Sequence, residues 1–233
     1  MIAVLTGAGI SRESGLQTFR DQDGLWAGHR VEEVCTPHAL ARNRRFVLDF
    51  YNQRRKEFNG SRIKPNAAHL ALAELEQKMP GKVLIITQNI DTLHEQAGSR
   101  NVLHMHGEIN KARCEECGAV LEWNEDITVG DSCPECGEQG RLRPHIVFFH
   151  EMPFFMEEIE AALKRCSLFT AIGTSGVVYP AAGFCSLART AGARCLELNL
   201  EPSLVCGVFH EARQGPATRL VPAFVQEVLR KYA

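Results

Sequence analysis

Short runs of apolar residues recur along the chain, and each ends in a small cluster of glycines or polar residues. The runs are continuously apolar rather than alternating, which is typical of strands buried on both faces of a parallel sheet. Because ligands bind beyond the carboxyl ends of such strands, the polar clusters predict one crevice there. The predicted strands are Ile2–Thr6, Val83–Thr87, Leu168–Ile172 and Cys195–Leu198.

Segments with helical periodicity lie between these strands. Asn66 is a suitable N-cap for a helix over Ala67–Met79, which ends at Pro80-Gly81. The other predicted helices are Arg42–Phe58, Glu157–Cys166, Ala181–Ala191 and Ala223–Tyr232. The alternation predicts an α/β fold in which helices flank a parallel sheet. A polar, glycine-rich segment from Cys114 to about Arg143 breaks the rhythm and is predicted to be an insert.

Composition narrows the class of protein. A chain of 233 residues, 45% of them hydrophobic, suits one large domain or one domain with a small insert. The net charge of -2 gives no basic surface for nucleic acid. No apolar run reaches the roughly 18–20 residues that span a bilayer. The first strand follows Met1 without a basic leader, so we expect no secretory signal.

Nine cysteines divide into two groups. Cys35, Cys166, Cys185, Cys195 and Cys206 are scattered, which favours reduced thiols and a cytoplasmic location over a disulfide framework. The other four form two C-x-x-C pairs separated by fifteen residues, and a glycine follows each pair. Four thiolates at this spacing predict a structural zinc site, because no coordination position stays open. The alternatives are a redox motif or chance. The predicted ligands are Cys114, Cys117, Cys133 and Cys136.

Gly7-Ala8-Gly9 follows the first predicted strand. Glycines at such a turn let the backbone approach a pyrophosphate, although an ordinary tight turn has the same pattern. Arg12 stands where the usual dinucleotide fingerprint has its third glycine, which disfavours a conventional dehydrogenase. Arg20 is a candidate to pair with a phosphate, and a surface arginine is the alternative.

Six ordered motifs together resemble the sirtuin family, over nearly the whole chain. The best match is its bacterial CobB-type branch of NAD-dependent protein deacylases. The motifs are Gly7-Ala8-Gly9-Ile10-Ser11, Gly15-Leu16-x-Thr18-Phe19-Arg20, Gln88-Asn89-Ile90-Asp91, His106-Gly107, the four paired cysteines and Gly173-Thr174-Ser175.

The resemblance implies a Rossmann-type domain and a smaller domain with a zinc-ribbon and a helical module. NAD and an acyl-lysine peptide would meet between them. We expect the large domain to comprise residues 1–29, 67–110 and 146–233, the helical module 30–66 and the zinc module 111–145. The implied NAD contacts are Gly7, Ala8, Gly9, Ile10, Phe19, Arg20, Trp26, Gln88, Asn89, Ile90, Asp91, Gly173, Thr174, Ser175, Asn199, Leu200, Glu201 and Ala217.

The resemblance also implies the reaction. NAD would be consumed, with nicotinamide, O-acyl-ADP-ribose and free lysine as products. A base must remove a proton from a ribose hydroxyl, and the pKa of histidine suits that task. His106 matches the family's catalytic histidine, whereas nearby His104 is expected to be structural.

Val47, Tyr51, Arg54 and Phe58 share one face of the predicted helix 42–58, so Arg54 interrupts an apolar row. An arginine that extends from the edge of the stripe is the plain interpretation. Tyr51 and Arg54, however, match the pair that marks sirtuins acting on acidic acyl groups. A succinyl or malonyl carboxylate is costly to bury without a partner, and these side chains would supply one.

The substrate peptide is expected to add as a strand between residues 147–151 and 177–180, with contacts from Val147, Phe149 and Val178. Backbone recognition of this kind predicts acylated lysines of many proteins as partners, with no specific nucleic acid or membrane, for a monomeric enzyme. His150 stands where the family usually has glycine. Two alternatives are a mono-ADP-ribosyltransferase of the same fold and a non-catalytic zinc-ribbon binding module.

Overall fold

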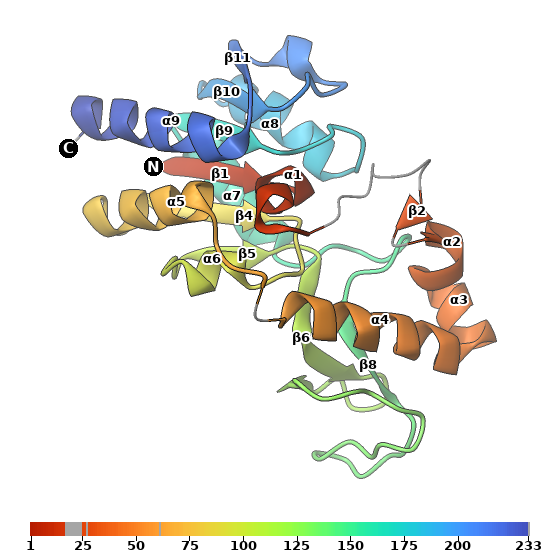
Figure 1. Ribbon diagram of the computed structural model, residues 1–233. Coiled ribbons are helices and arrows are strands. Elements are labelled where there is room, and N and C mark those ends of the chain that lie inside the picture. Colours follow the sequence, from red (N-terminus) through yellow and green to blue (C-terminus); the bar gives the residue numbers. More distant parts are fainter. Residues whose placement is uncertain (17–24, 27, 61, 233) are drawn as a thin grey trace.

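The computed structural model describes residues 1–16, 25–26, 28–60 and 62–232. Its main sheet has six parallel strands in the order β11-β10-β9-β1-β4-β5 (Figure 1). After β1 the chain adds β4 and β5 on one side of that strand, and it then returns to add β9, β10 and β11 on the other side. This order is the Rossmann arrangement. The strands are β1 (Ile2–Thr6), β4 (Val83–Thr87), β5 (Val102–His104), β9 (Leu168–Ile172), β10 (Arg194–Asn199) and β11 (Glu211–Gln214).

Helices cover both faces of this sheet. On one face α5 (Ala67–Lys78) packs beside α9 (Ala217–Tyr232), and on the other α7 (Met156–Arg165) packs beside α8 (Phe184–Thr190). Alternate residues of β1 feed the two layers, since Val4 faces the first and Leu5 faces the second. Both are buried, which explains why the strands are apolar throughout. The predicted α/β class and Rossmann-type sheet are confirmed.

The expected strands β1, β4 and β9 have the predicted bounds, and β10 is one residue longer at each end. Edge strands β5 and β11 were not predicted. Residues of β11 alternate between half-buried and exposed, so they lack the continuous apolar pattern. Asn66 caps α5 as expected, because its side chain accepts a hydrogen bond from the Ala68 amide (2.9 Å).

Three helix predictions had wrong boundaries. The helix expected at 42–58 is α4 (Arg44–Phe58), because Asn43 is its N-cap and Arg42 is the last residue of a separate helix, α3 (Pro37–Arg42). Residues 181–183 form a 3-10 turn before α8. Helix α9 begins at Ala217, and its second residue, Thr218, bonds with the distant Glu13 carboxylate at 3.0 Å through its amide and 2.7 Å through its hydroxyl.

A smaller body lies beside the carboxyl ends of the sheet (Figure 1). Its helical part contains α2 (Val31–Val34), α3 and α4, together with the two-residue strands β2 (Leu25–Trp26) and β3 (His29–Arg30). Its second part is an antiparallel sheet of β6 (Gly107–Cys114), β7 (Val120–Glu122) and β8 (Leu142–Ile146) in the order β7-β6-β8. The predicted division into domains stays a prediction, and β6 and β8 run across its boundaries at 110/111 and 145/146.

Helix α4 joins the two parts of the smaller body. Leu48 packs into the apolar cluster of the cysteine module, while Val47 and Phe50 pack into that of the helical module. Arg55 is fully buried and donates to the carbonyl groups of Ile109 (2.9 Å) and Glu125 (3.1 Å) and to the side chain of Asn52 (2.9 Å). Burial lowers the pKa of Arg55 to about 10, so it stays charged at neutral pH.

Among the described residues, no helix combines the length and apolar character needed to cross a membrane.

We expect Arg55→Met to lower the free energy of unfolding by roughly 2 kcal/mol, because the variant leaves buried carbonyl oxygens without a donor. Urea denaturation monitored by circular dichroism would measure the change. Arg45→Met is the matched control on the same helix, since its side chain is exposed and its pairing with Asp49 spans 3.9 Å. Equal stability of the two variants would contradict this role for Arg55.

Candidate active site

A cleft with a volume of about 1110 Å³ opens at the carboxyl ends of β1, β4, β9 and β10. It is larger than the roughly 300–1,000 Å³ of ordinary small-molecule pockets. Its walls come from the strand-end loops on one side and from residues 146–153 on the other. The crevice expected at the switch point of the sheet is therefore present.

Glycines let the loops after β1 and β9 touch. The Gly7 amide donates to the carbonyl of Ile172, and the Gly9 amide donates to that of Gly173, each at 3.0 Å. A Cβ on Gly9 would lie 2.6 Å from the Gly173 Cα, and Gly173 itself has a φ of +63°. These glycines are thus required for contact between two loops, in addition to any approach to a ligand.

A buried hydrogen-bond chain lies beneath the centre of the cleft. Asn89 donates to the Gly7 carbonyl (3.2 Å) and to the Ser11 hydroxyl (3.1 Å), which in turn donates to Asp91 (3.0 Å). The second oxygen of Asp91 accepts from the Leu93 amide (3.0 Å). Burial raises the pKa of Asp91, while these two donors oppose the shift. The chain fixes both side chains at the floor of the cleft.

His106 lies on the wall of this cleft. Its Nδ1 is 3.0 Å from the carbonyl oxygen of Gln88. A carbonyl only accepts, so Nδ1 carries the proton and Nε2 keeps the lone pair of a general base. Burial lowers the pKa of His106, which keeps the ring neutral at neutral pH. The next residue, Gly107, has a φ of +85°, and a Cβ there would collide with the His145 carbonyl.

His104 has a different role. It is buried, and its two ring nitrogens bond to the Asn89 carbonyl (3.1 Å) and the Glu95 carboxylate (2.8 Å). Although burial disfavours the charged ring, the bond to Glu95 raises the pKa of His104. With both nitrogens occupied and no place on the cleft wall, His104 is structural, as expected.

The far end of the cleft is formed by the loops after β9 and β10. Asn199 accepts from the Thr174 amide and donates to the Thr174 carbonyl, both at 2.9 Å, so its side chain joins the two loops. Leu200 and Glu201 are exposed beside it, and Ala217 at the start of α9 completes the wall.

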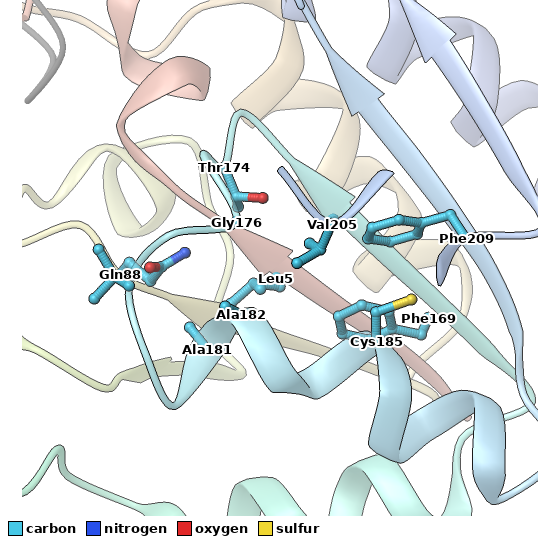
Figure 2. Close-up of a pocket in the computed structure, with 12 residues that line it drawn as sticks. Leu5, Gln88, Phe169, Thr174, Gly176, Ala181, Ala182, Cys185, Val205 and Phe209 are labelled. Carbon is cyan, nitrogen blue, oxygen red and sulfur yellow. The ribbon is translucent and has the colours of Figure 1, made fainter. Parts of the chain in front are cut away.

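A second cavity lies under these loops (Figure 2). Gln88 and Thr174 line it together with apolar side chains, among them Phe169, Cys185 and Phe209. Its volume of about 10 Å³ is room for one water molecule, not for a dinucleotide.

Most of the predicted site residues line the cleft. They are His106, Gly7, Ala8, Gly9, Gln88, Asn89, Ile90, Asp91, Gly173, Thr174, Ser175, Asn199, Leu200, Glu201, Ala217, Val147, Phe149 and Val178. Ile10 instead faces the core beneath α5 and α9, with no exposed surface. Phe19 and Arg20 lie outside the described residues, as does the side chain of Trp26.

Tyr51 and Arg54 are not among the residues that line the cleft. Tyr51 is fully buried and stacks on Phe148, with ring centroids 5.6 Å apart. Arg54 pairs with Glu57 at 2.7 Å, and its side chain is 17% exposed. Cys35 and Phe58, neighbours of Tyr51 in the same cluster, form the adjacent part of the wall.

The four paired cysteines converge at the end of the smaller body. Their sulfur atoms all lie within 4.8 Å of one another, with 3.8 Å between Cys114 and Cys136 and between Cys117 and Cys133. A tetrahedral zinc with bonds of about 2.3 Å needs sulfurs about 3.8 Å apart, so the geometry fits. Four protein ligands leave no position for a substrate, which makes the zinc structural.

Comparison with known proteins agrees with this geometry. A model of the Sir2 family matches residues 7–180, which is more than half of the chain. The chain belongs to the Sir2 family, the sirtuins. It is 58% identical to an NAD-dependent protein deacylase of Vibrio parahaemolyticus, over 98% of this chain and 95% of that protein.

Two solved Sir2 structures are also similar. A Sir2 homologue in complex with NAD has a TM-score of 0.88 at 36% identity, over all of this chain and 90% of the other. Sir2Af2 bound to a myristoylated histone peptide has a TM-score of 0.75 at 33% identity, over 99% of this chain and 91% of the other.

Several cleft residues have contacts that their sequence pattern does not indicate. Ser11 is buried and joins Asn89 to Asp91, and its place within the first Sir2 motif was the available signal. Cys35 was grouped with the scattered thiols because the residues next to it in the sequence do not indicate its contact with Phe149. The Phe149 amide donates to its carbonyl at 2.9 Å.

We expect one zinc ion per chain in protein purified without chelator, measured by mass spectrometry. Removal of the ion, or Cys117→Ser, should increase hydrogen exchange in residues 114–142, because zinc thiolate bonds hold a module that has a small core. Amides of β1 and β9 should stay protected. Cys206→Ser, outside the cluster, is the control. Well under one zinc per chain would refute the site.

Proposed function

We propose that this protein removes acyl groups from lysine side chains of other proteins with consumption of NAD, and that it accepts acidic acyl groups (succinyl and malonyl) as well as acetyl. The observation that carries the proposal is the position of His106. It lines the same cleft as the loops after β1, β4, β9 and β10 and as residues 146–151. Nicotinamide, O-acyl-ADP-ribose and the free lysine are the proposed products.

NAD is a substrate in the proposed reaction: the acyl oxygen attacks the ribose carbon as nicotinamide leaves, and the adjacent ribose hydroxyl then captures the acyl carbon. One water molecule adds to that carbon as the lysine amine leaves, which balances the products. The task of this chain is to hold that sugar beside a base. Nε2 of His106 removes the hydroxyl proton, because Nδ1 is already bonded to the Gln88 carbonyl. Asn89 and Asp91, fixed by Ser11, are proposed to orient the ribose and nicotinamide.

The peptide is proposed to bind as a strand between two segments that line the cleft and lie outside the regular strands of the protein. Val147 and Phe149 belong to one segment, and Val177, Val178 and Tyr179 belong to the other. Exposed surface on Phe149 (40%), Val177 (52%) and Tyr179 (75%) is available for flanking side chains. Backbone pairing of this kind accepts many sequences, which favours many protein substrates.

Selectivity for acidic acyl groups is proposed to depend on Arg54. Its present partner is the Glu57 carboxylate, so the carboxylate of a succinyl group would take over a pairing that already exists in the protein. Tyr51, on the same helix face, is proposed to supply a hydroxyl. We also propose that the enzyme acts as a monomer in the cytoplasm, a location that its free cysteines favour.

Arg54→Met should reduce kcat/KM for succinyl-lysine peptide by roughly 10- to 100-fold, the loss expected when a charge-assisted bond is removed. Deacetylation should change far less. Steady-state assays of acetyl, succinyl and malonyl peptides, with and without NAD and with mass spectrometry of the products, would measure this. Lys56→Met is the control on the same helix. Equal losses on both substrates would contradict carboxylate recognition, and ADP-ribose on protein would indicate transferase activity.

The pH profile should show the base. Because burial lowers the pKa of His106 from its ordinary 6.5, its neutral form persists into mildly acidic solution. Deacetylation kcat/KM should therefore fall with a midpoint below pH 6.5 as the solution is acidified. Residual activity of His106→Ala should be very low and should lack this limb. An unchanged limb in the variant would assign the titration to another group.

A further inference from the structure

Glu151 receives four hydrogen bonds, which occupy the roughly four acceptor sites of a carboxylate. Arg143 donates to its two oxygens at 2.7 and 3.1 Å, and Arg113 donates to one of them at 2.9 Å. The other oxygen accepts from the Phe148 amide at 2.7 Å. We call Arg113, Arg143 and Glu151 the carboxylate clamp.

Arg143 is the buried member of the clamp, with 2% of its surface exposed. Its guanidinium lies 3.8 Å from the centre of the Phe148 ring and also donates to the Ile146 carbonyl at 3.0 Å. A buried charge needs partners of this kind, because removing one of them leaves a large desolvation cost. The clamp therefore specifies one position for residues 146–151 rather than simply adding stability.

The segment that the clamp holds contains a turn with a strained residue. The Glu151 amide donates to the Phe148 carbonyl at 3.0 Å, which closes a turn over Phe149 and His150. His150 has a φ of +73°, in the left-handed region that favours glycine. A histidine persists there only where the surrounding contacts impose the conformation.

This turn is also attached to the site. The Val147 amide donates to the carbonyl of His106, and the Phe149 amide donates to that of Cys35, both at 2.9 Å. The same residues form one wall of the cleft. A shift of the turn would therefore change the edge that is proposed to pair with the peptide, next to the base.

Each clamp arginine is adjacent in sequence to a residue of the zinc module. Arg113 precedes the predicted ligand Cys114, and Arg143 follows Leu142, which belongs to the apolar cluster of the module. Arg113 pairs with Arg143 across β6 and β8, and the next pair in the register is Cys114 with Leu142. Figure 1 shows these two strands running from the main body to the cysteine module. The strand end that the metal would hold is thus continuous with the two side chains that hold Glu151.

We propose that Glu151 is a positioning residue through which the zinc module controls the peptide-binding edge of the cleft. The clamp maintains the left-handed His150 turn, and the turn sets the position of residues 147–149. The inference rests on the proposed deacylase function for its kinetic test, while its structural test is independent of activity.

Glu151→Gln should raise the KM for acetyl-lysine peptide by roughly tenfold, the effect of losing a charge-assisted bond, with the KM for NAD nearly unchanged. Adding His150→Gly should recover much of this loss, because glycine adopts the turn without the clamp. Glu122→Gln, in an exposed pair on the same module, is the control. Equal changes in both KM values, or a double variant as impaired as Glu151→Gln, would overturn the proposal.

Hydrogen exchange of residues 147–151 supplies the test that needs no activity. Exchange there should rise in Glu151→Gln and after zinc removal from the unsubstituted protein, and it should stay low in Glu122→Gln. Arg113→Gln, which removes one of the four bonds, should give a smaller rise and serves where Glu151→Gln does not fold. Unchanged exchange after zinc removal would overturn the coupling. Inactivity of the unsubstituted enzyme on all peptides would instead refute the proposed function.

Discussion

The loops that follow β1 and β9 touch through their backbones, and the cleft depends on this contact. Gly9 bonds to Gly173 with no room for a side chain between them. The two strands are neighbours at the switch point of the sheet. The contact between their loops therefore fixes the position of the backbone at the floor of the cleft. Asn89 is tied to the same floor through the Gly7 carbonyl. A side chain on either glycine would separate loops that must face one ligand together.

Strand β6 gives the smaller body a direct connection to this floor. It begins at Gly107, immediately after the proposed base, and ends at Cys114, a metal ligand. The carbonyl of Gln88 fixes the ring of His106 at one end, and the four sulfurs fix the other end. A structural metal that takes no part in the chemistry can therefore still affect the geometry around the base, because both belong to one strand.

The sequence predicted the parts of the molecule that follow from local pattern. Continuous apolar runs gave β1, β4 and β9 their bounds, and paired cysteines indicated the zinc site. The edge strand β11 was missed because three of its four residues are polar, and the start of α9 was missed because Glu13, distant in sequence, bonds to its first turn. Ile10 was grouped with the cleft because it lies within a motif, but helix geometry turns it toward the core.

The position of Arg54 explains how one pocket could serve neutral and acidic acyl groups under the proposed function. An arginine without a partner would be costly beside a buried acetyl group. Glu57 removes that cost by pairing with Arg54 within the same helix turn. An acidic acyl group exchanges one carboxylate for another, so the number of charged pairs is conserved, while a neutral group leaves the internal pair intact. Selectivity then depends on the difference in energy between the pairing of Arg54 with Glu57 and its pairing with the acyl carboxylate. That difference is smaller than the energy of either pairing.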